Sequence, residues 1–83
     1  MLKMQESFGR RLQRALDNKG MTQIELHRMS GINNTTINMY YNGNSLPGIN
    51  FLTIIAQTLD CNELWLLGYN VPFSRDIIMT EVT

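Results

Sequence analysis

The sequence predicts an all-α domain built from five short helices. Apolar residues recur at intervals of three and four, capping residues and glycines divide the chain into short segments, and β-strand signals are nearly absent. The chain has 83 residues, which is the length of one small domain with a thin core. We expect this domain to occupy residues 1–68, and residues 69–83 to form a C-terminal tail or linker outside the compact core.

The first two helices are predicted from an apolar stripe and from a capping sequence. The stripe has the spacing of one helix face and consists of Phe8, Leu12, Ala15 and Leu16. It predicts a helix near residues 5–18, which Gly20 can end in a left-handed conformation. Thr22 and Glu25 have the three-residue spacing of a capping box, so a second helix is expected near residues 22–30.

The third helix, expected near residues 33–41, has an unusual composition. Asn33 is a suitable N-cap, and Ile37 and Tyr40 supply an apolar inner side. The outer side consists of asparagine and threonine, which are poor helix formers because their side chains compete for backbone hydrogen bonds. The segment from residue 31 to residue 43 contains no charged residue. This composition raises the question of what the outer side does.

Two more helices complete the predicted fold. Apolar residues at helical spacing predict a helix near residues 48–59, and they are Ile49, Leu52, Ile55, Ala56 and Leu59. Asn62 can cap a last helix near residues 62–67, which Gly68 closes. The following residues show no helical period.

The composition argues against several classes of protein. One cysteine, Cys61, and one histidine, His27, are too few for an internal disulfide or a structural zinc site. No apolar run approaches the roughly 20 residues of a membrane span, and the N-terminus lacks the apolar segment of a signal peptide. No acid, base and nucleophile are in register with one another. We therefore expect a cytoplasmic protein with no catalytic residue, metal, cofactor, small-molecule ligand or membrane contact.

Charge is distributed unevenly along the chain. The formal net charge is zero, which does not by itself indicate a nucleic-acid binder. Residues 1–28 nevertheless carry six basic and three acidic side chains, whereas residues 29–83 carry one basic and four acidic side chains. A basic half suggests one face for a polyanion, and an ordinary solvated surface explains the asymmetry about as well.

The second and third predicted helices are separated by about three residues around Gly31, which is the helix-turn-helix pattern. An asparagine amide can pair with the N6 and N7 edge of adenine, and a threonine methyl group can contact the thymine methyl group. Cations bind any phosphate, whereas amides discriminate between bases. We interpret the third helix as one that reads base edges in double-stranded DNA. A merely solvated helix face is the alternative.

The chain resembles the Cro/CI-type helix-turn-helix family, which comprises the repressors of temperate phages and their bacterial relatives. The resemblance covers about residues 8–68 and rests on the joint register of Gly20, Met21, Thr22, Gln23, Leu26, Gly31, Ile32, Thr36, Ile37, Tyr40, Gly43, Pro47, Leu52, Ile55, Ala56, Leu59, Trp65 and Leu66. It implies a compact five-helix, lambda-repressor-like fold. The segment ELWLLGYNVPF is most similar to the N-terminal DNA-binding domain of phage CI-type repressors.

Positions that match the family imply two sets of DNA contacts. The residues expected to face DNA are Gln23, Asn33, Asn34, Thr35, Asn38, Met39 and Asn42. Candidate phosphate contacts are Arg10, Arg11, Arg14, Thr22 and Asn44. The resemblance thus implies a sequence-specific repressor that acts as a homodimer on a palindromic operator. The alternative is a protein-interaction module on the same fold, such as an antirepressor that binds a partner repressor, and the zero net charge favours it.

Dimerisation and packing give further expectations. We expect the dimer contact to come from the last helix around Trp65 and Leu66, or from residues 75–83. His27 stands where the family usually has a small alanine, and Ser30 stands where an apolar residue is frequent. An arginine–glutamate pair that often joins the first and third helices is replaced by Leu16 and Tyr41, which we expect to share an apolar cluster.

Overall fold

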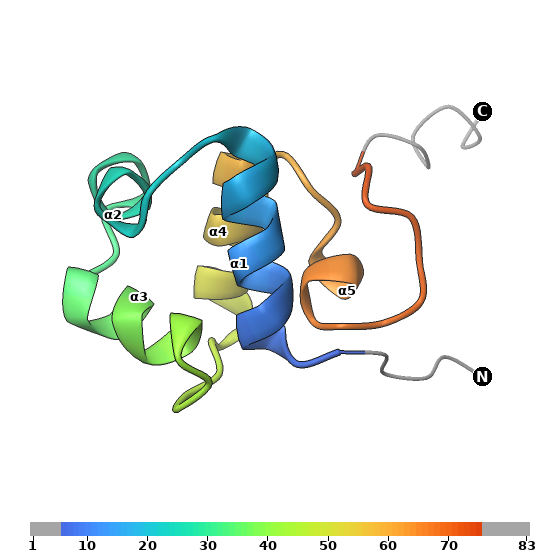
Figure 1. Ribbon diagram of the computed structural model, residues 1–83, viewed down its shortest axis with the longest axis horizontal. Helices are drawn as coiled ribbons and strands as arrows, with labels where there is room; N and C mark the ends of the chain where they lie inside the picture. The colour runs from blue at the N-terminus through green and yellow to red at the C-terminus, as the bar shows by residue number, and fades with distance from the viewer. Residues whose placement is uncertain (1–5, 76–83) are drawn as a thin grey trace.

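The computed structural model describes residues 6–75 and contains five helices (Figure 1). They are α1 (Phe8–Lys19), α2 (Gln23–Ser30), α3 (Asn34–Tyr41), α4 (Ile49–Leu59) and α5 (Glu63–Leu66). The all-α prediction is confirmed, and each predicted helix is present with its ends shifted by no more than three residues. Most of the predicted starts were N-cap residues, which lie just outside the helix they cap.

Side chains cap the starts of four helices. Thr22 Oγ1 accepts a hydrogen bond from the backbone N–H of Glu25 at 3.1 Å, and Glu25 Oε1 accepts one from the backbone N–H of Thr22 at 2.9 Å. The predicted capping box is therefore present. Asn33 Oδ1 accepts from the Thr35 N–H at 2.7 Å, and Asn62 and Ser7 cap α5 and α1 in the same way. These bonds satisfy backbone donors that a helix start leaves unpaired.

Two polar side chains hold the turn between α2 and α3. Gly31 ends α2 with a φ of 78°, and Ile32 inserts into the core at 2% exposure. Ser30 Oγ accepts from the Ile32 N–H at 3.1 Å, and His27 Nδ1 donates to the Ile32 carbonyl oxygen at 2.7 Å. The two departures from the family pattern therefore supply hydrogen bonds that fix the turn and the direction in which α3 leaves it.

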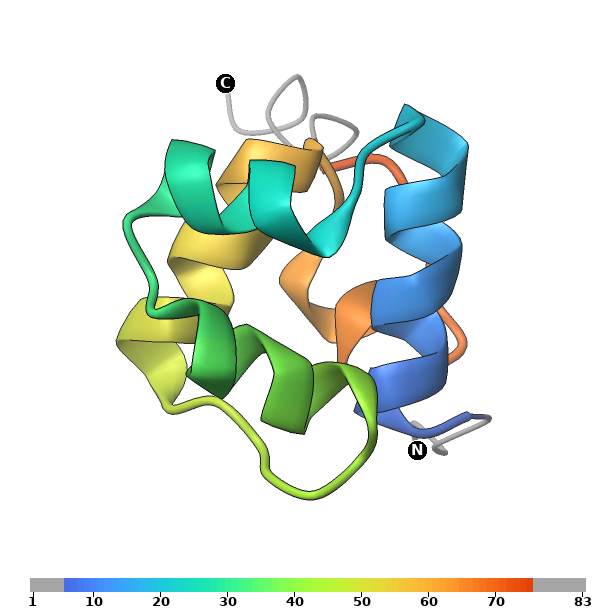
Figure 2. The same cartoon turned by 60° about the vertical axis from the view of Figure 1, so that its left-hand side comes forward.

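The core lies between all five helices; in Figure 1, α1 stands between α2 and α3 on one side and α5 on the other, and Figure 2 shows it along one side of the molecule. Its largest fully buried side chains are Phe8, Leu12, Leu26, Ile37, Ile55, Leu59, Leu66 and Cys61. The rings of Phe8 and Tyr40 meet edge to face with centroids 5.7 Å apart. The inner side of α3 is thus packed against the start of α1, as the positions of Ile37 and Tyr40 predicted.

Gly9 allows the end of α3 to approach α1 closely. A Cβ atom at this position would lie 3.0 Å from the Tyr40 carbonyl oxygen, 3.2 Å from the Tyr41 carbonyl oxygen and 3.3 Å from the Gly43 nitrogen. All three are backbone atoms, so the space cannot be cleared by rotating a side chain. Gln13 Nε2 donates to the Tyr41 carbonyl oxygen at 3.1 Å and holds the same helix end.

The prediction that the tail lies outside the core is wrong for residues 69–75. The Phe73 ring packs edge to face on Trp65 with centroids 4.7 Å apart. Arg75 Nη1 donates to the Cys61 carbonyl oxygen at 3.0 Å and lies 2.9 Å from Glu63 Oε1. These contacts are not visible as a period in the sequence, because they come from single side chains on an irregular segment. Residues 76–83 lie outside the described part of the chain.

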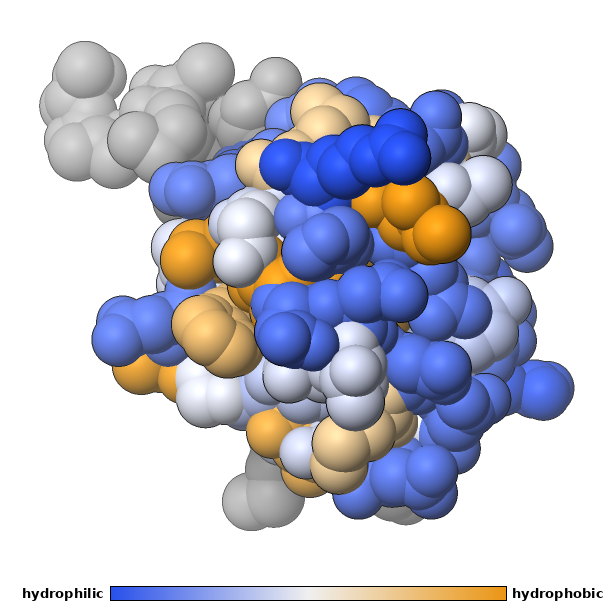
Figure 3. Space-filling view, turned by 90° about the vertical axis from the view of Figure 1, so that its left-hand side faces the viewer, coloured by the Kyte–Doolittle hydropathy of each residue, from blue (hydrophilic) through white to orange (hydrophobic). Residues whose placement is uncertain are grey.

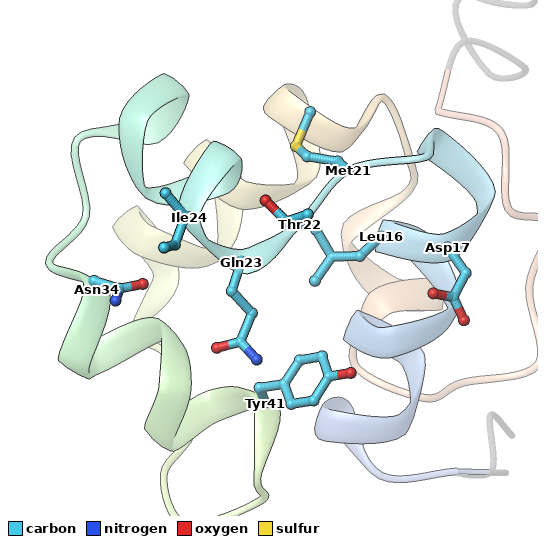
Figure 4. Close-up of a pocket in the computed structure, with 8 residues that line it drawn as sticks. All are labelled: Leu16, Asp17, Met21, Thr22, Gln23, Ile24, Asn34 and Tyr41. Carbon is cyan, nitrogen blue, oxygen red and sulfur yellow. The ribbon is translucent and has the colours of Figure 1, made fainter.

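Leu16 and Tyr41 line the same cleft between α1 and α3 (Figure 4). Leu16 is buried in the core, and Tyr41 is half-buried against the core. Leu16 and Tyr41 therefore share the apolar cluster predicted for them, at the place of the ion pair that the family often has.

We expect Leu16→Ala to lower the free energy of unfolding by about 2–4 kcal/mol, since it removes buried apolar contacts and leaves a cavity. Urea unfolding followed by circular dichroism measures this loss. Asn18→Ala is the matched control, because Asn18 is exposed in the same part of α1, and its effect should stay within about 0.5 kcal/mol. A loss for Leu16→Ala no larger than that of the control would contradict the packing described here.

Candidate nucleic-acid interface

The outer side of α3 is an exposed and uncharged surface. Ile37 and Tyr40 point inward and are buried, with exposures of 0% and 4%. The opposite side exposes Asn34, Thr35, Asn38, Met39 and Asn42. Figure 3 shows the face that α2 and α3 form, with hydrophilic side chains over most of it and hydrophobic ones at the upper right of centre, at the centre and along the left and lower edges. The division of α3 into inner and outer sides agrees with the prediction.

Most of the predicted base-reading residues surround one shallow hollow. It is lined by Asn34, Thr35, Asn38, Met39, Asn42 and Asn44. Asn44 joins this surface because its backbone N–H donates to the Met39 carbonyl oxygen at 2.8 Å, which folds the loop back against α3. Asn33 is exposed as well, but its side-chain oxygen caps α3. The hollow is therefore bounded on most sides by amide groups.

Two of these amides are joined to each other. Asn42 Nδ2 donates a hydrogen bond to Asn38 Oδ1, one helical turn away. The bond uses one donor of Asn42 and one lone pair of Asn38. Both Nδ2 hydrogens of Asn38 and the side-chain oxygen of Asn42 stay available. Asn38 thus presents a donor and Asn42 an acceptor, and the hydrogen bond between the two amides fixes the position of both.

Gln23 lies beside this surface, at the first position of α2. Figure 4 shows its side chain extending from α2 toward Tyr41, in the cleft that Leu16 and Asn34 also line. The side chain is half-buried, and the structure places it between α2 and α3. Thr22 is exposed just before it, with its hydroxyl oxygen engaged in the capping box.

The predicted phosphate contact at Arg11 is wrong. The Arg11 side chain is 7% exposed, and its Nε lies 2.6 Å from Glu6 Oε1. Its Nη1 donates to the Trp65 carbonyl oxygen at 2.7 Å, and the guanidinium lies 4.6 Å from the centroid of the Trp65 ring. The sequence placed Arg11 among exposed arginines because its partners are distant in the chain or precede the helix.

The other two arginines of α1 remain at the surface. Arg14 is 63% exposed on its side chain and lies 3.1 Å from the same Glu6 oxygen. Because Arg14 also borders Trp65 and Phe73, it lies toward the α5 side of α1. Arg10 is exposed and has no ion pair among the described residues. Of the three, Arg10 is the least engaged cation.

Comparison with known proteins identifies the fold and the family. The sequence profile of the helix-turn-helix family matches residues 12–66, which is most of the chain. The protein belongs to the Cro/CI-type helix-turn-helix family. A comparison with curated protein sequences found no match.

Two solved structures have the same fold. The restriction-modification controller protein C.AhdI from Aeromonas hydrophila is 25% identical, with a TM-score of 0.67 over 71% of this chain and 89% of its own. A transcriptional regulator from Listeria innocua is 20% identical, with a TM-score of 0.69 over 94% of this chain and 73% of its own. The two structures share the fold, and membership of the Cro/CI-type family supports a DNA-binding transcriptional regulator.

The dimer contact predicted around Trp65 and Leu66, or in residues 75–83, stays a prediction, but α5 offers less exposed surface for it than its sequence suggested. Leu66 is fully buried in the core, and Trp65 is covered in part by Phe73 and Arg11. The helical spacing of α5 could not show this, because the residues that cover Trp65 come from α1 and from the C-terminal segment. Arg75 is engaged with Cys61 and Glu63, and the rest of the predicted tail contact lies outside the described residues.

Residues 6–75 contain no group of three or more His, Cys, Asp and Glu side chains that could hold a metal ion. No helix in the same range is long and apolar enough to cross a membrane. Burial raises the pKa of the Cys61 thiol from 9.0 to about 12, which disfavours the thiolate that a nucleophile requires.

The raised pKa of Cys61 predicts a loss of stability in alkaline solution. Above about pH 9 the unfolded chain loses the thiol proton while the folded chain keeps it, so the free energy of the unfolded state falls relative to that of the folded state. We expect the free energy of unfolding to fall between about pH 8.5 and pH 10 by about 1 kcal/mol more in the wild type than in Cys61→Ala. Urea unfolding at several pH values measures the difference, and parallel declines would contradict the burial of the thiol.

Proposed function

We propose that the protein is a sequence-specific transcriptional repressor of the phage CI type, which binds double-stranded DNA as a homodimer on a palindromic operator. Repression follows from occupation of a promoter, which excludes RNA polymerase and needs no catalysis, cofactor or small-molecule ligand. The observation that carries this proposal is the exposed side of α3. Amide side chains are concentrated there, whereas the inner side of the same helix is fully committed to the core.

The joined amides of Asn38 and Asn42 suit the edge of adenine. Adenine presents an acceptor, N7, and a donor, N6–H, in the major groove. Asn38 offers hydrogen-bond donors, and the Asn42 side-chain oxygen offers an acceptor. Thr35 and Met39 border the same hollow and can contact thymine methyl groups. We therefore expect a half-site in which adenine and thymine occupy the positions opposite α3.

The scarcity of cations near α3 affects how the protein discriminates between DNA sequences. Non-specific affinity comes mainly from Lys and Arg side chains that neutralise phosphates. No charged residue occurs between Arg28 and Asp60, a range that contains α3 and α4. Backbone amides at helix starts and Gln23 are candidates for phosphate contacts near α3, beside the exposed side chains of Arg10, Arg14, Thr22 and Asn44. The protein is therefore expected to bind random DNA weakly and to depend on base contacts.

The same lack of charge favours a second function, a protein-interaction module such as an antirepressor. A salt titration of binding to random duplex DNA separates the two. For a DNA binder, the logarithm of the association constant falls linearly with the logarithm of the salt concentration. An interaction module binds random DNA too weakly to show such a slope. A measurable slope supports the repressor, and the absence of binding at low salt supports the interaction module.

We expect Asn38→Ala to lose about 1–3 kcal/mol of binding free energy on the preferred site, because it removes base contacts, and almost none on random DNA. The preferred site is first recovered by selection from a random DNA pool, and binding is then measured by fluorescence anisotropy. Asn18→Ala removes an exposed asparagine from α1 and should leave both affinities unchanged. Equal losses on both DNAs for Asn38→Ala would argue against base reading by α3.

A further inference from the structure

The cleft between α1, α2 and α3 adjoins the amide surface of α3 (Figure 4). Thr22, Gln23 and Asn34, all expected to face DNA, line this cleft together with Tyr41. Asn34 also lines the hollow on the outer side of α3, so the two depressions are neighbours. The cleft has a volume of about 620 Å³, which is ample for a phosphate group. It can therefore admit part of the DNA backbone while α3 contacts bases.

The Tyr41 side chain holds its hydroxyl group at a fixed place in this cleft. The ring is half-buried and packs against the core. Gln13 Nε2 donates to the Tyr41 carbonyl oxygen at 3.1 Å, and Gly9 lets the same end of α3 approach α1 closely. Figure 4 shows the hydroxyl oxygen at the free end of the ring, on the side toward α1. Packing and backbone contacts thus fix the hydroxyl before a ligand binds, which lowers the entropy cost of binding.

Two hydrogen-bond donors in the cleft are available to a ligand. Among residues 6–75, neither the Tyr41 hydroxyl nor the Gln23 side-chain amide has a hydrogen-bond partner. A phenol and a primary amide both carry hydrogens that an anionic oxygen can accept. Figure 4 shows the Gln23 side chain extending toward the Tyr41 ring, so both groups face the same cleft. The cleft thus offers uncharged donors from α2 and from the end of α3.

The charges around the cleft restrict where an anion can lie. Asp17 lines the cleft from α1, and Figure 4 shows its carboxylate at the opposite edge from Gln23. Arg10 lies two turns before Asp17 on the same face of α1, with Gln13 between them. Arg10 is exposed and has no ion pair among the described residues. An anion is therefore favoured toward the start of α1, where Gln13 contacts Tyr41, and disfavoured beside Asp17.

We propose that the Tyr41 hydroxyl donates a hydrogen bond to a phosphate oxygen of the DNA backbone, beside the Gln23 amide. This contact rests on the proposed function, since it adds a binding residue to the same protein–DNA interface. A phosphate contact positions the protein on the duplex and does not read bases. It also suits a surface with few cations near α3, because a phenol holds an anionic oxygen without carrying a charge.

The test removes the hydroxyl group and keeps the ring. We expect Tyr41→Phe to bind the operator recovered by selection about tenfold more weakly, because a hydrogen bond to a charged group is lost. The slope of affinity against salt concentration should stay unchanged, since an uncharged donor releases no counterion. Tyr69→Phe is the matched control, because Tyr69 is also half-buried but follows α5, and it should bind like the wild type. Thermal unfolding checks that both variants fold.

Changes in the DNA locate the contact. Single phosphates of the operator are replaced in turn by uncharged methylphosphonates, and binding is measured by fluorescence anisotropy. We expect one phosphate in each half-site at which the wild type loses several-fold more affinity than Tyr41→Phe does. Equal losses by the two proteins at every phosphate would overturn the proposal. A different base preference of Tyr41→Phe in selection would also overturn it, because the hydroxyl would then contact a base.

Failure of the proposed function has a different result from failure of this inference. If the wild type selects no site from the random pool and binds no duplex at low salt, the proposed function fails, and the phosphate contact fails with it. If the wild type binds its operator and Tyr41→Phe binds it equally well, only the role of the Tyr41 hydroxyl is misassigned.

Discussion

The close approach of α1 and α3 at Gly9 is the constraint on which the arrangement of the molecule depends. A Cβ atom there would lie 3.0 Å from the Tyr40 and 3.2 Å from the Tyr41 carbonyl oxygen, so a larger residue would require the backbone of α3 to shift. The approach lets Phe8 and Tyr40 stack edge to face and lets Gln13 hold the Tyr41 carbonyl oxygen. Glycine weakens a helix by up to about 1 kcal/mol. At this position the glycine also allows the close approach that fixes α3 relative to the rest of the core.

Because α3 is held in place by contacts on its inner side, the side chains of its outer side are not needed for packing. Helix stability there does not rely on propensity, since Ile37 and Tyr40 are buried and Asn33 caps the start. The turn before α3 is fixed by His27 and Ser30, which bond to the backbone of Ile32. The outer side can therefore consist of poor helix formers. This explains in physical terms why amides and threonines, rather than glutamates and lysines, are found on this exposed helix.

The sequence predicted the parts of the fold that depend on neighbours along the chain. Periodic apolar residues, the capping box at Thr22 and the N-cap at Asn33 gave five helices and the two sides of α3. Contacts between distant segments could not be predicted in this way: Arg11 donates to the Trp65 carbonyl oxygen, and the Phe73 ring packs on Trp65. The four-residue spacing of Asn38 and Asn42 places the two side chains next to each other on a helix. The spacing does not show which amide donates the hydrogen bond and which accepts it.

Replacement of single atoms in the DNA tests most directly whether uncharged amides of α3 read base edges. In the selected operator, each adenine is replaced in turn by 7-deazaadenine, which lacks the N7 acceptor but keeps Watson–Crick pairing. We predict that the wild type loses about tenfold in affinity at one or two adenines of each half-site, and that Asn38→Ala shows no further loss at the adenine that Asn38 contacts. Equal affinity of the wild type for every substituted operator would contradict it.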